Sequence, residues 1–188
     1  MNGKPIQRVK RFLYLGRWFD ENDDDSYCIN ENIKKARGRW NSIANILKRE
    51  GANAAVMGRF YLNIIQAVLL YGAESWTINK RNMGKLNSFH YRSVRHMTGH
   101  HIQKRGEVWE YPKHEPLLKK AKLFPIEKYI ERRRGTLRKY LMECKPNLMQ
   151  KAYSTSKHCY DAHKILWWKQ PWIEKRTLDQ FQRTWLEE

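Results

Sequence analysis

The spacing of apolar residues predicts a mainly helical protein whose first long helix spans about residues 29–49. Apolar positions in this segment recur alternately every four and every three residues, which is the period of one face of an α-helix. The stripe consists of Ile29, Ile33, Ala36, Trp40, Ile43 and Leu47. Asn30 is the expected N-cap, and Gly51 is the expected stop. Because Trp40 lies on this stripe, we expect its ring to belong to the core and not to a base-stacking surface.

The middle of the chain predicts two more helices, one mostly buried and one amphipathic. Residues 54–71 are apolar nearly all round, so a helix here is buried over most of its surface. Its polar stripe is Arg59, Asn63 and Gln66. A helix over about residues 82–97 follows, with Met83, Leu86, His90 and Met97 on its apolar side. Its other side carries Arg81, Lys85, Arg92 and His96.

The C-terminal part is expected to contain a fourth long helix and an aromatic tail. Residues 126–141 have helical periodicity and follow Pro125, a residue that favours a helix start. A short helix is expected at 116–122, whereas residues 98–116, with their Gly, Pro and His, are predicted to be a loop. The tail from 158 to 188 holds four of the eight tryptophans, and we expect one or two helices that dock on the body.

The N-terminal segment is expected to be a short strand followed by an acidic turn. Residues 11–19 are rich in residues that favour strands, with Gly16 at a bulge or a point of close approach. Residues 20–25 are expected to form an exposed turn. The predicted fold is therefore mainly α: a helical bundle with a short N-terminal β-hairpin or strand and a Trp-rich helical tail. We expect four segments, at 1–28, 29–100, 101–145 and 146–188.

The balance of charge adds a polyanionic partner to this picture. The chain has 37 Lys and Arg against 19 Asp and Glu, a net charge of +18, and residues 31–145 contain 25 basic and 9 acidic side chains. Such an excess is typical of proteins that bind nucleic acid. An anionic membrane surface is the alternative, although it usually involves one basic amphipathic helix with an exposed apolar face. The longest apolar run, residues 67–73, is too short to cross a membrane.

Basic and amide side chains on the predicted helices are candidate contacts to phosphate groups. Four of them project away from the apolar stripe of the first helix: Lys34, Lys35, Lys48 and Arg49. On helix 126–141, one side suits a row of phosphates because it stacks Lys128, Arg132 and Lys139. The middle helices add Arg59, Asn63, Gln66, Lys85 and Arg92.

The arginine run 132–134 divides by helical phase. Arg134 and Arg138 share a face with two glutamates of the same helix, Glu127 and Glu131, which favours local ion pairs. Arg133 falls in the middle of the apolar face, where a guanidinium either reaches out to water or pairs with a buried acceptor.

No metal site and no cofactor are expected. Residues 23–25 are three adjacent aspartates, but adjacent carboxylates in an exposed turn point in different directions. Helical spacings that could hold zinc occur in two sets: His96, His100 and His101, and separately Cys159 and His163. Neither set has Cys-x-x-Cys spacing or a clean second pair, so solvated or phosphate-contacting histidines are the favoured interpretation.

Several motifs follow one another at spacings shared with a known polymerase family. Residues 12–16 (FLYLG) are similar to its F-x-Y-L-G strand, and residues 68–76 (VLLYGAESW) to its L-x-Y-G-x-E-x-W segment. Residues 86–99 are similar to L-x-x-F-x-x-R-x-x-R with a small-residue stop, and residues 123–134 to L-x-P-I/L with an Arg-rich helix. Over roughly residues 10–142, the chain thus resembles the C-terminal part of non-LTR (LINE-like) retrotransposon reverse transcriptases.

The resemblance implies a place for this chain within the polymerase. In that family the strand at 12–16 belongs to the hairpin that grips the primer end, which implies that Tyr14 and Gly16 contact nucleic acid. The helices that follow form the thumb, which lies against the template–primer duplex. The catalytic Tyr-Ala-Asp-Asp motif and the earlier palm aspartate would lie before Met1. The chain is therefore expected to lack the carboxylates that hold Mg²⁺ and not to polymerise alone.

The leading hypothesis is a non-catalytic fragment of a retrotransposon RNA-directed DNA polymerase, whose thumb helices contact the backbone of an RNA, DNA or hybrid duplex. It would act in the nucleus or cytoplasm, alone or within a larger polymerase. One alternative is an RNA-binding structural subunit of a large ribonucleoprotein, such as a ribosome in a mitochondrion or other organelle. Another is a protein-interaction module that docks through the Trp-rich tail. The three scattered cysteines favour a reducing compartment.

Overall fold

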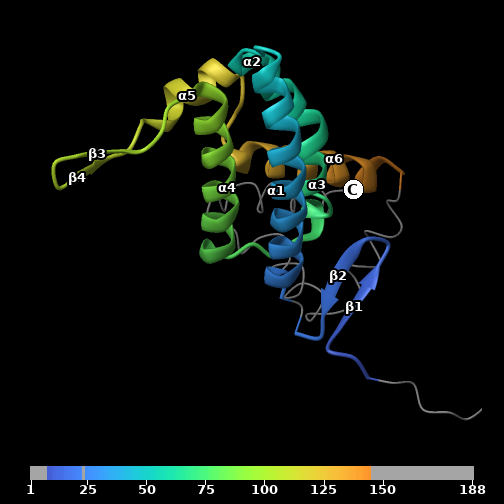
Figure 1. The fold of residues 1–188 in the computed structure, drawn as a ribbon. Helices are drawn as coiled ribbons and strands as arrows, with labels where there is room; N and C mark the ends of the chain where they lie inside the picture. Colours follow the sequence, from blue (N-terminus) through green and yellow to red (C-terminus); the bar gives the residue numbers. More distant parts are fainter. Residues whose placement is uncertain (1–7, 23, 145–188) are drawn as a thin grey trace, which may run out of the picture.

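The computed structural model describes residues 8–22 and 24–144, which form a helical bundle with two short antiparallel hairpins (Figure 1). In chain order the elements are β1 (Arg11–Tyr14), β2 (Arg17–Asp20), α1 (Ser26–Arg49), α2 (Ala54–Phe60), the π-helical turn η1 (Tyr61–Ile65), α3 (Gln66–Leu69), the 3-10 turn η2 (Ala73–Ser75), α4 (Lys80–Thr98), β3 (Gln103–Arg105), β4 (Val108–Glu110), α5 (His114–Ala121) and α6 (Ile126–Cys144). The predicted mainly helical class with an N-terminal hairpin is confirmed. The predicted Trp-rich tail, with Cys159 and His163, lies outside the described residues.

Helices α1 and α4 lie side by side and run in the same direction (Figure 1). Near their N-termini the Asn82 amide donates to the Ser26 hydroxyl at 2.9 Å, and further along the rings of Trp40 and His96 meet with centroids 6.0 Å apart. Trp40 is 4% exposed, which confirms its predicted place in the core. Because α1 begins at Ser26, Asn30 lies inside the helix and is not the predicted N-cap.

The segment that connects α1 to α4 departs from the single predicted helix 54–71. It contains the π-helical turn η1 and ends at Leu69. The predicted polar stripe is wrong at Gln66, which is buried, although Arg59 and Asn63 are exposed. The physical reason is that a π-helical turn inserts an extra residue and changes the phase of the residues after it. Periodicity counted from the α-helical turn before it therefore places Gln66 on the wrong face.

Residues 11–19 form a hairpin and not one continuous strand. The two turn residues, Leu15 and Gly16, both have positive φ, 47° and 82°. Two such residues in a row are the requirement of the tight primed turns that connect antiparallel strands. Gly16 therefore makes the turn and not the predicted bulge, and the ring of Tyr71 packs against it at 3.5 Å from the position of an added Cβ. Leu15 is apolar and continues the pattern of a strand, so the sequence pattern did not indicate a turn at this residue.

The acidic segment 20–25 was predicted to be an exposed turn, but part of it is buried. Asp25 is 5% exposed, and its two carboxylate oxygens accept from Arg17 at 2.8 Å and from the backbone N–H of Thr77 at 2.7 Å. A carboxylate is tolerated inside a protein when it is paired and hydrogen-bonded in this way. Asp25 thus ties the N-terminal hairpin and the start of α1 to the segment before α4.

Residues 71–76, which carry the clearest resemblance motif, connect the N-terminal hairpin to α1. The hydroxyl of Tyr71 donates to the carbonyl of Leu15 at 2.7 Å, and the carbonyl of Tyr71 accepts from the Asn32 amide of α1 at 3.0 Å. Gly72 has a φ of +79°, a conformation that glycine adopts without strain. Each of these residues therefore has an architectural role.

The same segment also holds α6. Arg133, predicted either to reach out to water or to pair with a buried acceptor, pairs with Glu74 at 3.0 Å, and both side chains are partly exposed. Arg134, predicted to form local ion pairs, is instead 6% exposed and donates to the carbonyl of Trp76 at 2.6 Å. This happens because α6 packs its Arg134 side onto the η2 segment, a contact between residues 58 positions apart in the chain.

The predicted loop 98–116 contains a second hairpin, which we call the arm. It consists of β3 and β4, pairs Lys104 with Trp109, and extends away from the helices (Figure 1). After it, α5 begins at His114 and not at 116. The ring of His114 stacks on Tyr91 of α4 with centroids 3.7 Å apart, which anchors the base of the arm to the bundle.

Candidate nucleic-acid interface

The parallel packing of α1 and α4 creates a basic groove of about 380 Å³, which we call the α1–α4 groove. Its lining includes Arg37 from α1 and Arg81, Lys85 and Arg92 from α4, and no acidic residue. The Lys85 ammonium donates to the Asn30 side chain across the groove at 2.8 Å. Two sequence-predicted contacts, Lys85 and Arg92, are thereby brought together with two basic residues from outside the predicted set.

The α4 side of this groove has the dimensions of a short stretch of nucleic-acid backbone. Arg81, Lys85 and Arg92 share one helical face, and a rise of about 1.5 Å per residue spreads them over roughly 16 Å. One strand of B-DNA advances about 3.4 Å per phosphate, so this row passes several phosphates. The guanidinium groups can donate two parallel hydrogen bonds to a phosphate, which an ammonium cannot.

The predicted contacts on α1 divide between two sides of the helix. Lys34 lies one turn from both Asn30 and Arg37 and therefore flanks the α1–α4 groove. Lys48 lies close to His96, beyond the Arg92 end of the groove. The pKa of His96 is lowered first by burial and then by the positive charge of Lys48. Lys35 and Arg49 are exposed on a different side of α1. None of the four predicted residues of α1 lines the groove itself, although Lys34 and Lys48 lie beside it.

A second groove, of about 950 Å³, lies between the α2–α3 segment and α6, and brings Asn63, Gln66 and Arg132 together. Its wall also contains the ion pair of Glu74 with Arg133, so the positive charge here is partly neutralised. Compared with the α1–α4 groove, this one is larger and less basic. We therefore rank it second as a phosphate site.

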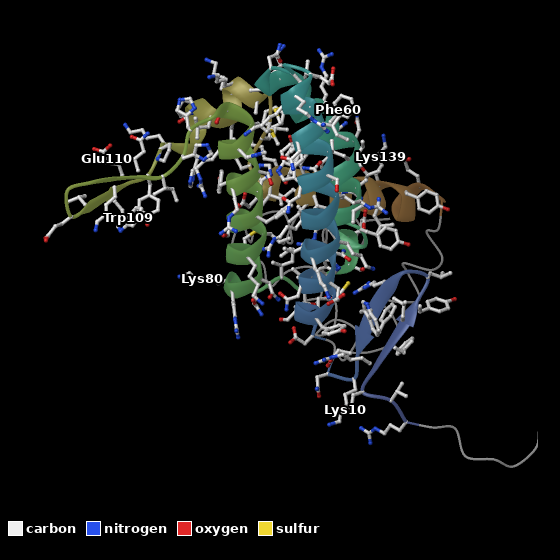
Figure 2. The ribbon with its side chains drawn as sticks, viewed as in Figure 1. Lys10, Phe60, Lys80, Trp109, Glu110 and Lys139 are labelled. Atoms are coloured by element: carbon white, nitrogen blue, oxygen red, sulfur yellow. The ribbon has the colours of Figure 1, made fainter. Side chains whose placement is uncertain are left out.

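The remaining predicted residues are not brought together. Lys128 lies with its ammonium 5.4 Å from the centroid of the Phe124 ring, and Lys139 pairs with Glu143 at 3.7 Å. Figure 2 shows Lys139 and the arm on opposite sides of the molecule. Arg59 is exposed and lines neither groove. Tyr14 of the N-terminal hairpin is 60% exposed and remains available for contact.

Sequence reasoning missed two groove residues, Arg37 and Arg81. Arg81 shares its helical face with Lys85 and Arg92, so that signal was present in the periodicity of α4. Arg37 lies one turn from the predicted contact Lys34, but its place in the groove depends on which helix packs beside α1.

Within residues 8–22 and 24–144, no three His, Cys, Asp or Glu side chains gather where they could hold a metal ion. None of the helices in these ranges has the length and apolar character needed to span a membrane. Comparisons with protein-family models, curated proteins and solved structures found no match to this chain.

Proposed function

We propose that this protein binds a nucleic-acid duplex through the α1–α4 groove, as a non-catalytic, thumb-like fragment of a retrotransposon reverse transcriptase. The observation that carries the proposal is the groove itself, with four basic side chains and no acidic one on its walls. The ancestry rests on the resemblance of residues 10–142 to that polymerase family.

The physical argument for a nucleic-acid partner is the mutual repulsion of the basic side chains in the groove. Arg37, Arg81, Lys85 and Arg92 place four positive charges within one small groove, and the rest of the chain adds to a net charge of +18. Phosphate groups neutralise such a row, and the release of their counterions favours binding. Contacts of this kind position a duplex and do not read its sequence.

The test compares two double variants that lose the same charge. Arg81→Gln with Arg92→Gln removes two groove contacts, whereas Lys119→Gln with Lys120→Gln removes two exposed charges of α5 that line neither groove. We expect the groove variant to bind a DNA or hybrid duplex about 10- to 100-fold more weakly. Its slope of log K against log salt should fall by about two.

The α5 variant should keep most of the affinity, because a phosphate contact depends on position and not on net charge alone. Fluorescence anisotropy with a labelled duplex, repeated over a series of salt concentrations, measures both quantities. Equal losses in the two variants would show that binding follows net charge, and the proposed interface would then be wrong.

A further inference from the structure

The arm carries two large aromatic rings that the fold does not use. Trp109 is 55% exposed and Tyr111 is 67% exposed. The arm is a two-stranded hairpin that projects from the bundle, with Trp109 and Glu110 on opposite sides of it (Figure 2). Aromatic side chains of this size are usually buried, so exposure of both rings indicates a surface that meets a partner.

The alternation of side chains along a strand gives this surface a defined composition. Tyr111 follows Trp109 by two residues, directly after the end of β4, so the two-residue alternation of the strand assigns it to the face of Trp109. Lys104, directly opposite Trp109 on β3, belongs to the same face, and its ammonium lies 6.0 Å from the centroid of the indole ring. Glu110 and Val108 belong to the other face. Two stacking surfaces and a cation therefore lie together, and the neighbouring carboxylate points away.

The arm also continues the basic row of α4. Arg95 lies one turn beyond Arg92 of the α1–α4 groove, and it stands within electrostatic range of both Arg92 and Tyr111. Burial and the Arg92 guanidinium lower the pKa of Arg95, and the Tyr111 hydroxyl raises it. The stacked pair of His114 and Tyr91 holds the arm at this end of α4. The base of the arm, with Tyr111, thus lies next to the C-terminal end of this basic row.

We propose that the aromatic face of the arm binds unpaired nucleotides of a strand that continues from a duplex held in the α1–α4 groove. This inference rests on the proposed function. Every base has a flat π-surface, so two exposed rings beside a lysine stack successive bases with little sequence preference. The position of the arm beside the basic row of α4 favours a strand of nucleic acid over a protein partner.

The test uses two labelled duplexes of the same sequence, one blunt and one with a single-stranded extension of about six nucleotides. The extension is placed at the 5′ or the 3′ end and made of DNA or RNA, and each of these substrates is measured separately. Of the extended duplexes, the one that binds most tightly should bind the wild-type protein at least about fivefold more tightly than the blunt duplex does. Trp109→Ala with Tyr111→Ala should abolish that preference and leave the affinity for the blunt duplex unchanged. Trp109→Phe, which keeps a ring, should retain most of it.

Val108→Ala is the matched control, because Val108 is 68% exposed on the opposite face of the same strand. It should keep the preference, and a loss here would overturn the proposal by showing that any change to the arm has the same effect. Equal binding of blunt and extended duplexes by the wild-type protein would overturn the proposal and leave the duplex function standing. Failure to bind either duplex would overturn the proposed function as well.

Discussion

Mild acid should destabilise the bundle through one buried histidine, His90. Its ring is fully buried, and its Nε2 lies 3.0 Å from the carbonyl of Phe124. Because a carbonyl only accepts, Nε2 carries the proton, and the bare Nδ1 accepts from the hydroxyl of Tyr61 at 2.9 Å. Burial lowers the pKa of His90 from 6.5 to about 4, against the weaker opposing effects of the Phe124 carbonyl and of Glu127.

The sign and size of the effect follow from this difference in pKa. The folded state disfavours the charged ring, so the unfolded chain takes up the proton first as the pH falls. Stability is therefore complete above about pH 6.5 and declines as the pH falls toward about 4. The full difference corresponds to about 3 kcal/mol, of which about 2 kcal/mol is lost between about pH 8 and about pH 5.

Urea unfolding at these two pH values, followed by far-UV circular dichroism, measures the loss. His90→Gln is expected to lose this part of the pH dependence, since its amide can still donate to the Phe124 carbonyl but does not titrate. Tyr61→Phe is the matched control: it is less stable because Nδ1 loses its donor, but it keeps the titrating ring and the pH dependence.

Other histidines do not confuse the comparison. Burial also lowers the pKa of His96 and of His114, and both residues remain in every variant. The decisive quantity is thus the difference between wild type and His90→Gln in the free energy lost on acidification. If the two proteins lose the same amount, His90 does not distinguish the folded from the unfolded state, and the burial argument is refuted.

Two further substitutions test the packing. Gly58→Ala should destabilise by about 1–3 kcal/mol because its methyl group would overlap the backbone oxygen of Ala121, whereas Gly38→Ala, in open space on α1, should stabilise by about 0.5–1 kcal/mol. Thermal and urea unfolding measure both, and a stabilised Gly58→Ala would contradict the close approach of α2 and α5. Trp40→Ala should cost about 3–5 kcal/mol, since the ring is buried and packs edge-on against Tyr61. An unchanged unfolding midpoint would show that this ring is dispensable to the core.

The sequence by itself determined those features that depend on neighbours within one or two helical turns. The stripe through Trp40 predicted α1 and its buried face, and the periodicity of α4 placed Lys85 and Arg92 together. These features are readable because an α-helix repeats every 3.6 residues, so side chains that share a face are already close in the chain. The mainly helical class follows from the same local rule.

The sequence predicts less accurately those elements whose geometry depends on unusual backbone conformations. The turn at Leu15 and Gly16 needs two positive φ values, and of these two residues only the glycine is a type that favours positive φ. The π-helical turn before Gln66 shifts the helical phase without any special residue type. The arm lies in a segment where Gly and Pro indicated a loop, and its three-residue strands are too short to show alternation.

Only the tertiary structure decided which polar groups are buried and which basic side chains face one another. Asp25 was expected in an exposed turn and Arg134 in local ion pairs, but each is buried and makes a hydrogen bond to the backbone of a residue more than 50 positions away, Thr77 and Trp76 respectively. The groove is decided in the same way: Arg37 meets Arg92 because α1 and α4 run parallel, and nothing within α1 specifies that neighbour. The physical reason is that burial and electrostatic neighbourhood arise from packing between distant segments, whereas helical phase arises within one segment.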